Sequence, residues 1–160
     1  QVSLYRFLGL SRLFPGSRRF GRYNLTYLDP DAPADVDSVV GACMLVRGRA
    51  IDQVGLLDET FWMYGEDLDW SLRMHRAGWR IGYRPQVVVW HEKRAASRHS
   101  ERASYEFQRA MWIFYHKHYE RDTPTAVHLL VLAALAVRGG PRLIREMRDA
   151  GPILRRPQRV

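Results

Sequence analysis

The sequence contains little cysteine and little lysine. Cys43 is its single cysteine, which excludes an internal disulfide and with it a small secreted domain held together by disulfides. Only Lys93 and Lys117 are lysines, so arginine carries nearly all of the net charge of +8. The planar guanidinium group suits phosphates and diphosphates. The charge therefore leaves nucleic acid, anionic lipid headgroups and nucleotide substrates open as partners.

Apolar runs of membrane-spanning length are absent as well. The run VHLLVLAALAV at 127–137 is shorter than the roughly 20 residues that a spanning helix needs, so we expect it not to cross a bilayer alone. It is a helix packed on its own domain or an element at a membrane surface, because it is followed by arginines that include Arg138, Arg142, Arg145, Arg148, Arg155 and Arg156. No charged-then-apolar leader follows Gln1, and we expect the chain to be a piece of a longer protein.

The residues that are present can bury one core. Apolar residues make up 46% of the chain and aromatic residues 12%, which favours a single domain at this length. Residues 1–36 predict a basic, loop-rich approach segment that ends in a proline-rich turn. Residues 37–99 are dense in short apolar segments, and residues 100–160 have helical periodicity.

Strands and helices are expected to alternate within 37–99. VVGACMLV at 39–46 is typical of a buried strand, and RAIDQVG at 49–55 of a short helix closed by glycine. DLDWSLRMHRAG at 67–78 predicts a helix of about three turns. WRIGYRP at 79–85 and QVVVWH at 86–91 predict two further short strands, with Pro85 between them.

An acidic cluster, Glu66, Asp67 and Asp69, lies among aromatic residues in YGEDLDW. In the first turn of a helix each carboxylate would contribute roughly 0.3 to 1 kcal/mol through the helix dipole, so a purely structural role is one interpretation. His91 at the end of a predicted strand indicates the other interpretation, because that strand end and the helix start can meet at one edge of a sheet. A base and a metal ligand would then lie together.

Residues 37–91 resemble the acceptor-side half of inverting family 2 glycosyltransferases, in particular bacterial rhamnosyltransferase-like enzymes. The resemblance keeps order and spacing over many positions: Gly41, Ala42, Arg47, Gly55, Asp58, Glu59, Phe61, Tyr64, Gly65, Glu66, Asp67, Asp69, Arg73, Ala77, Gly78, Pro85 and His91. It implies an α/β fold of the GT-A type, with a mainly parallel sheet flanked by helices. We expect 37–99 to be the acceptor and catalytic half of such a domain, 100–160 its C-terminal helices, and the nucleotide-binding half to be missing.

The resemblance also implies the chemistry. Asp67 would be the general base that takes the proton from an acceptor hydroxyl, while Glu66 orients the acceptor or the metal shell, or caps the helix. Asp69 is expected to be structural and paired with Arg73. Contacts with substrate are expected from Asp58, Glu59, Trp62, Tyr64 and Arg73. For Asp58 and Glu59, turn and capping chemistry is the alternative.

His91 resembles the late metal ligand of the family, and the cofactor implied is Mg²⁺ or Mn²⁺ bridging the donor diphosphate. The D-x-D motif that normally completes that site is missing, since DPD at 29–31 lies in a proline-rich turn. QRAMW at 108–112 does not match the motif of processive members, which favours a single-addition enzyme. A zinc site is disfavoured because WHEKR lacks a second histidine and the pair His116 and His118 lacks a third ligand.

The expected function is transfer of a sugar, such as rhamnose, from a nucleotide-sugar donor to a saccharide or lipid-linked acceptor in cell-surface polysaccharide synthesis. The expected location is the cytoplasm, at the inner face of the cell membrane, because many such acceptors are lipid-linked. The alternative from another class is a basic nucleic-acid-binding module without catalysis, although its basic residues are dispersed. We expect the isolated chain to be inactive, and to be either poorly soluble or self-associated through the apolar edge of 39–46.

Overall fold

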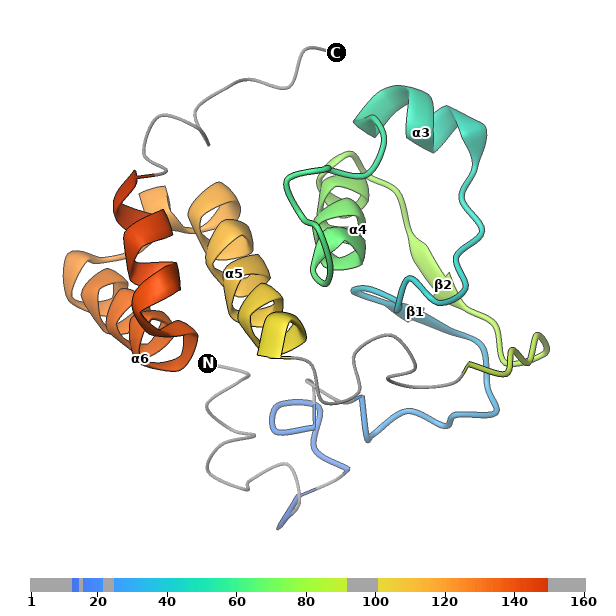
Figure 1. Cartoon of the computed structure of the whole chain (residues 1–160). Helices are drawn as coiled ribbons and strands as arrows, with labels where there is room; N and C mark the ends of the chain where they lie inside the picture. The colour runs from blue at the N-terminus through green and yellow to red at the C-terminus, as the bar shows by residue number, and fades with distance from the viewer. Residues whose placement is uncertain (1–12, 15, 22–24, 92–100, 150–160) are drawn as a thin grey trace. The chain divides into compact units, whose positions relative to one another are not determined.

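The structure is a computed structural model that describes residues 13–14, 16–21, 25–91 and 101–149 (Figure 1). The chain divides into two compact units: residues 1–36 with 80–89, and residues 37–79 with 90–160. Each unit is described by itself. The division expected from the sequence, at 36 and 99, stays a prediction.

The first unit contains a two-stranded antiparallel sheet, in which β1, Ala34–Val36, pairs with β2, Ile81–Tyr83. Val36 lies opposite Ile81 in the register, and both side chains are buried. The sequence predicted the strand of 79–85, and β2 confirms it. The parallel sheet that a GT-A fold implies is not found among the described residues, whose strands form this antiparallel pair alone.

The DPD sequence at 29–31 forms a turn before β1. The backbone N–H of Asp31 donates to Oδ1 of Asp29 at 2.9 Å, and the N–H of Ala32 donates to the carbonyl oxygen of Asp29 at 3.2 Å. An aspartate that accepts from the backbone two residues on is a standard turn device. Asp29 therefore serves the turn, as its proline-rich surroundings predicted.

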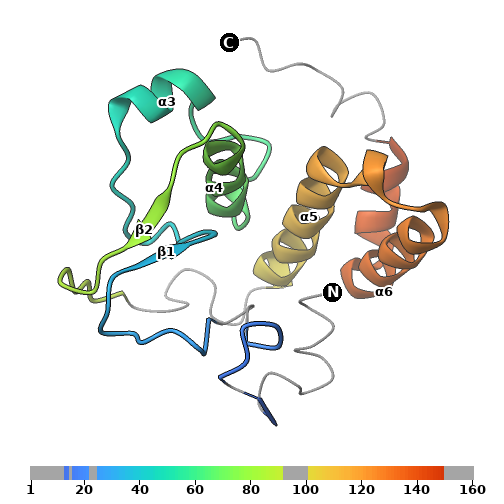
Figure 2. The same cartoon turned by 180° about the vertical axis from the view of Figure 1, so that it is seen from behind.

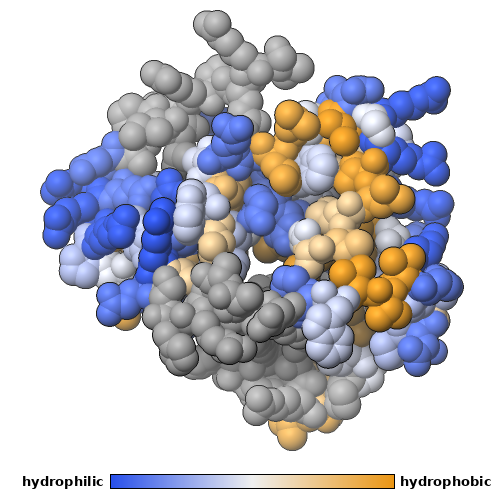
Figure 3. All heavy atoms as spheres, turned by 45° about the vertical axis from the view of Figure 1, so that its right-hand side comes forward, coloured by the Kyte–Doolittle hydropathy of each residue, from blue (hydrophilic) through white to orange (hydrophobic). Residues whose placement is uncertain are grey.

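Two of the predicted strands are wrong. Residues 39–46 form a turn and irregular backbone in which Val40 is 71% and Leu45 103% exposed. Residues 86–91 begin in a turn after Pro85 and continue unpaired, with Val88 and Trp90 exposed. A short apolar run becomes a strand only when a neighbouring strand takes its backbone hydrogen bonds. Neither segment has such a neighbour among the described residues, and apolar side chains accordingly form part of the surface (Figure 3).

The two helices predicted in 37–79 are confirmed, both in the second unit. Helix α3 is Gly48–Val54 and ends at Gly55, whose φ of 78° allows the chain to leave the helix. Helix α4 is Glu66–Arg76. Trp70 of α4 joins the two helices, because its Nε1–H donates to the carbonyl oxygen of Gly55 at 2.9 Å.

The helical prediction for 100–160 is confirmed over the described part of that region. Helix α5 is Glu101–His118, a 3-10 turn η1 spans Glu120–Asp122, and α6 is Thr125–Asp149. Helices α5 and α6 pack side by side (Figure 2). The core of the unit lies between them and the segment before α4, and consists of Phe61, Ala110, Trp112, Ile113, Leu135 and Leu143.

Helix α6 bends in its second half. Gly140 has φ 69° and ψ −172°, which is not helical, and Pro141 follows it. Gly139 lies so close to Leu143 that a side chain there would overlap it, and Leu143 is fully buried. The helix is longer than the apolar run at 127–137, and by length and composition alone it could cross a membrane.

Candidate functional site

A strained turn places the acidic cluster at the start of α4. Tyr64 has φ 67° and Gly65 has φ 80°, so two consecutive residues adopt the left-handed conformation. Such backbone is costly for tyrosine and is found preferentially at functional sites. A Cβ atom at position 65 would lie 3.2 Å from the ring of Phe61, a tight contact that the ring would have to relieve by shifting. The turn fixes where Glu66 and Asp67 begin the helix.

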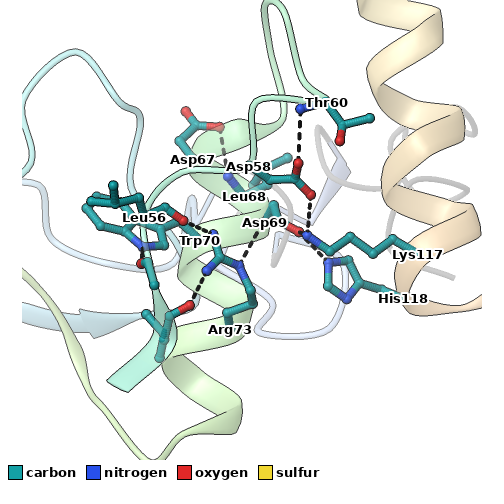
Figure 4. Close-up of polar contacts among 12 residues, drawn as sticks. Leu56, Asp58, Thr60, Asp67, Leu68, Asp69, Trp70, Arg73, Lys117 and His118 are labelled. Carbon is teal, nitrogen blue, oxygen red and sulfur yellow. Dashed lines mark hydrogen bonds and ion pairs between the residues drawn. The ribbon is translucent and has the colours of Figure 1, made fainter. Parts of the chain in front are cut away.

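Asp67 is held by the backbone on both of its carboxylate oxygens. The N–H of Gly41 donates to Oδ2 at 2.9 Å, and the N–H of Leu68 donates to Oδ1 at 2.8 Å. The side chain of Asp67 is half-buried, and its bond from Leu68 is drawn in Figure 4. Each carboxylate oxygen keeps a free lone pair beside its backbone donor. The geometry is suited to accepting a proton from a bound hydroxyl group.

Glu66 differs from its neighbour in one of its two carboxylate oxygens. Its Oε2 atom is buried and has no hydrogen-bond partner within the described part of the chain. A buried carboxylate oxygen without a donor is unfavourable, and such atoms in native structures call for a partner such as a ligand, an ion or water. Glu66 therefore has an oxygen available for a substrate hydroxyl or a cation.

Asp69 and Asp58 are joined by Lys117 of α5 (Figure 4). Asp69 is 0% exposed and Asp58 is buried. The Nζ atom of Lys117 lies 2.6 Å from Oδ2 of Asp58 and 2.7 Å from Oδ1 of Asp69. One ammonium group thus compensates two buried carboxylates, and it links the loop before α4 to α5.

The pKa values of both aspartates reflect this arrangement. Burial raises the pKa of Asp58, but hydrogen bonds from Lys117 and Thr60 outweigh burial and bring the pKa below its ordinary value. Burial likewise raises the pKa of Asp69, and Lys117, His118 and Arg73 together lower it further than burial raises it. Both carboxylates are therefore ionised, and neither is suited to act as a general acid or base at neutral pH.

His118 is the third partner of Asp69. Its Nε2 lies 2.7 Å from Oδ1 of Asp69, and its Nδ1 lies 2.9 Å from the guanidinium of Arg76. Arginine can only donate, so Nδ1 must accept and the proton must lie on Nε2, which donates to Asp69. Burial lowers the pKa of His118 below its ordinary value, and the partial opposition of Asp69 does not reverse that shift. The neutral ring is the form that this network fits.

Arg73 is used within the fold. Its Nε donates to Asp69 at 2.8 Å, one terminal nitrogen donates to the carbonyl oxygen of Leu56 at 2.7 Å, and the other donates to the carbonyl oxygen of Val54. The pairing of Arg73 with Asp69 is as the sequence predicted. Because all three nitrogens have protein partners, the geometry favours a structural role for Arg73. The same holds for Asp58, whose oxygens bind Lys117 and the N–H of Thr60.

Two aromatic residues and one acid complete the set of expected substrate contacts. Trp62 is 53% exposed, and the guanidinium of Arg102 lies 3.8 Å from the centre of its ring. Tyr64 is half-buried and meets the ring of Phe107 edge to face at 5.7 Å. Glu59 is exposed. Of these side chains, Trp62 presents the largest open aromatic surface, but its contact with a sugar stays a prediction.

The metal site expected at His91 is not formed by the described residues alone. His91 is exposed, and no three His, Cys, Asp or Glu side chains in the described part of the chain lie close enough together to hold a metal ion. These residues therefore do not fit a complete Mg²⁺ or Mn²⁺ site. Any site that includes His91 needs ligands from outside them.

Lys117, His118 and Arg76 are the residues that the sequence reasoning missed. Lys117 is one of only two lysines in an arginine-rich chain, which is a weak signal that a compact ammonium group is needed. His118 was considered only as a zinc ligand. The contacts of these residues join positions 42 to 59 residues apart, and periodicity within one helix cannot predict them.

Comparison with known proteins bears on this site. Residues 15–114 match the family described as "Glycosyltransferase like family 2". The chain is 47% identical over 53 residues to N-acetylglucosaminyl-diphospho-decaprenol L-rhamnosyltransferase of Mycobacterium tuberculosis, a match that covers 33% of this chain and 17% of the relative. It is 31% identical over 80 residues to the low-salt glycan biosynthesis hexosyltransferase Agl10 of Haloferax volcanii, covering 50% of this chain and 22% of that relative. No solved structure matches significantly.

The chain thus spans a small part of the length of these relatives, while the family match covers well over half of its own residues. The matched residues include the Tyr64–Gly65 turn, the acidic start of α4 and most of α5. The chain belongs to glycosyltransferase-like family 2, a family of sugar-transferring enzymes with the GT-A fold.

Proposed function

We propose that this chain supplies the general base and acceptor side of an inverting glycosyltransferase. The observation that carries the proposal is Asp67, a partly open carboxylate that the N–H groups of Gly41 and Leu68 hold at the start of α4. The donor would be a nucleotide sugar, with rhamnose as the sugar, and the acceptor a saccharide or a lipid-linked saccharide. The names of the mycobacterial and archaeal relatives support sugar transfer, and the mycobacterial name supports both the rhamnose and the lipid-linked acceptor.

The proposed reaction is a single in-line displacement. The acceptor hydroxyl gives its proton to a carboxylate oxygen of Asp67 while its oxygen bonds to the anomeric carbon of the donor. The bond between that carbon and the diphosphate oxygen breaks, and the nucleoside diphosphate leaves with the electron pair. Attack opposite the leaving group inverts the anomeric centre.

The surrounding residues would position this base. Lys117 holds the loop before α4 to α5 through Asp58, and Arg73 holds the end of α3 through two carbonyl oxygens. Glu66 would orient the acceptor through its unpartnered oxygen. General-base catalysis requires a base within hydrogen-bond reach of the reacting hydroxyl. Positioning the base in advance also lowers the entropic cost of bringing the two groups together.

A divalent cation would bind the donor diphosphate, with His91 as one ligand and further ligands from a nucleotide-binding part outside the described residues. The small fraction of each relative that this chain matches supports such a part. His91→Ala should weaken metal-dependent donor binding, measured by calorimetric titration with Mn²⁺ present or chelated. Unchanged metal dependence would remove His91 from the site.

The test of the base is Asp67→Asn, made in an enzyme that contains both this chain and its nucleotide-binding part. The substitution keeps the size of the side chain but removes its basicity, so turnover should fall by about 10² to 10⁴. Nucleotide-sugar binding should change little, because the base acts on the acceptor. Asp52→Asn, at an exposed position of α3, is the matched control and should retain turnover. Wild-type turnover in Asp67→Asn would refute the assignment.

A further inference from the structure

Helix α6 has an apolar face on its exposed side. Leu135 points into the core against α5, yet the opposite side of the helix carries exposed Leu129, Leu130 and Val137. Leu130 is 71% and Val137 84% exposed. The other exposed positions between Ala126 and Val137 are also small and apolar, namely Ala126, Val127, Ala133 and Ala134. We call these seven residues the outer face of α6.

An outer face of this kind is unusual. A helix at the surface of a globular protein normally has an apolar stripe toward the core and polar residues toward solvent. Here only 6% of the most apolar window of α6 is buried within the chain. Contiguous exposed apolar surface on a helix marks an interaction site with a protein or a membrane.

Basic residues border the outer face at one end. Arg138 follows it directly and is exposed, and Arg145 and Ile144 are exposed beyond the bend at Gly140. Arg142 lies with its guanidinium 4.1 Å from the ring centre of Tyr105. No acidic residue occurs from Thr123 to Arg145. The surface therefore combines exposed apolar side chains with exposed arginines.

This charge distinguishes the possible occupants. A second copy of the chain would bring the same arginines and a net charge of +8 toward this face, with no acidic residue on it to pair with them. An anionic lipid surface offers the opposite charge for the arginines and an apolar phase for the outer face. Charge complementarity thus favours lipid over a second copy.

The helix fits the membrane surface better than the membrane interior. The stretch from Thr125 to Gly139 rises about 22 Å at 1.5 Å per residue, less than the roughly 30 Å of a bilayer core. Its inner side is bound to α5, since Leu135 and Leu143 belong to the shared core and Glu146 accepts from Arg109 at 2.6 Å. Spanning would require α6 to leave that core.

We propose that α6 lies in the surface of an anionic bilayer, with its outer face among the upper acyl chains and Arg138 and Arg145 at the headgroups. Only the outer face enters the lipid, so the packing of α6 on α5 is retained. The proposal rests on this surface and not on the assigned catalytic function. An enzyme that glycosylates a lipid-linked acceptor would benefit from it, because surface attachment brings enzyme and acceptor together.

The experiment is co-flotation of the chain with vesicles of phosphatidylcholine alone or with phosphatidylglycerol added. The chain should float with the anionic vesicles, less at high salt, and little with the neutral ones. Leu129→Gln combined with Leu130→Gln should reduce anionic binding at least tenfold. Leu45→Gln, at a fully exposed apolar position outside α6, is the matched control and should bind like the wild type. Circular dichroism checks that each variant keeps its helices.

The charge contribution is tested separately by Arg138→Gln and Arg145→Gln. Each should weaken binding to anionic vesicles by about fivefold, the expected effect of one basic side chain near the surface. Absence of flotation with anionic vesicles would overturn the proposal, as would equal loss of binding in Leu45→Gln. Resistance of the bound chain to alkaline carbonate extraction would show a spanning helix instead. A dimer by light scattering that Leu129→Gln with Leu130→Gln dissociates would show that a second copy covers this face.

Discussion

The backbone N–H of Gly41 donates a hydrogen bond of 2.9 Å to Oδ2 of Asp67, across 26 positions of sequence. The bond joins the irregular segment that follows β1 to the proposed base. It leaves the carboxylate with a fixed orientation, because the N–H of Leu68 holds the other oxygen. The segment at 39–46 therefore serves as a support for Asp67 and not as the buried strand that its composition predicts.

Removing the N–H of Gly41 should lower the free energy of unfolding, whereas adding a side chain at this position should not. Gly41→Pro deletes the N–H, and a lost hydrogen bond to a charged group lowers the free energy of unfolding by about 1.5 to 3 kcal/mol. In Gly41→Ala the new Cβ would meet Asp67 at 3.5 Å, an ordinary contact, and the N–H is retained. We expect Gly41→Ala to stay within about 0.5 kcal/mol of wild type in urea denaturation. Equal stability of the two variants would mean that the bond contributes nothing.

The bridge formed by Lys117 gives a second prediction. Lys117→Met leaves Asp58 and Asp69 buried without their shared ammonium partner, which should lower the free energy of unfolding by about 3 kcal/mol. The control is Arg80→Met, which breaks the ion pair of Arg80 with Asp35, whose side chains are 85% and 58% exposed. That change should cost less than about 1 kcal/mol. A loss in Lys117→Met no larger than in the control would refute the bridge.

The parts of the fold that the sequence predicts are those with local causes. Helices α3 and α4 follow from apolar spacing and from Gly55 and Gly78 near their ends. Strand β2 follows from the apolar positions in WRIGYRP, although its partner Ala34–Val36 lies in a segment expected to be irregular. The strands expected at 39–46 and 86–91 failed because pairing depends on a distant neighbour, which an apolar run does not reveal.

The candidate site likewise has a part that the sequence predicts and a part that it does not. The position of Asp67 in the first turn of α4 and the pairing of Asp69 with Arg73 were predictable, because both lie within a single helix. The partners Lys117 and His118 were not, because they come from the far end of α5. Asp58 was expected to serve the turn or to contact substrate, and the hydrogen bond that it accepts from the N–H of Thr60 confirms the turn role. Its burial against Lys117 could only be learned from the packing of two elements.

The same network predicts a pH dependence. The pKa of His118 lies below 6.5 in the folded chain, mainly through burial, so the unfolded chain binds a proton first as the pH falls. The free energy of unfolding should therefore decrease from about pH 6.5 downward. A second decrease should begin below about pH 4, because the pKa values of Asp58 and Asp69 lie below 3.8 and their stabilisation is lost as the pH falls through those values.

His118→Gln isolates the first of these effects. The amide can still donate to Asp69 and accept from Arg76, but it does not titrate, so the slope between pH 5 and about 6.5 should flatten. The wild type, which keeps the titrating ring, is the reference and should retain the slope. Urea denaturation at half-unit steps of pH measures both proteins. An unchanged slope in His118→Gln would contradict the assignment of a neutral, buried ring.

The turn before the acidic cluster supplies the last prediction, which compares three glycines by two properties: the sign of φ and the space for a Cβ atom. Gly48 has space and no positive φ, Gly78 has φ 88° with open space, and Gly65 has φ 80° with the ring of Phe61 at 3.2 Å. Alanine should be neutral or slightly stabilising at 48, since alanine favours a helix. At 78 it should cost about 1 kcal/mol through backbone strain alone. At 65 strain and overlap add, and we expect the free energy of unfolding to fall by about 2 to 4 kcal/mol in urea denaturation.

In the complete enzyme Gly65→Ala should also reduce turnover, because the turn sets the start of α4 and with it the position of Asp67. Equal stability of Gly65→Ala and Gly78→Ala would show that Phe61 yields freely, and wild-type turnover of Gly65→Ala would show that the turn does not hold the base in place.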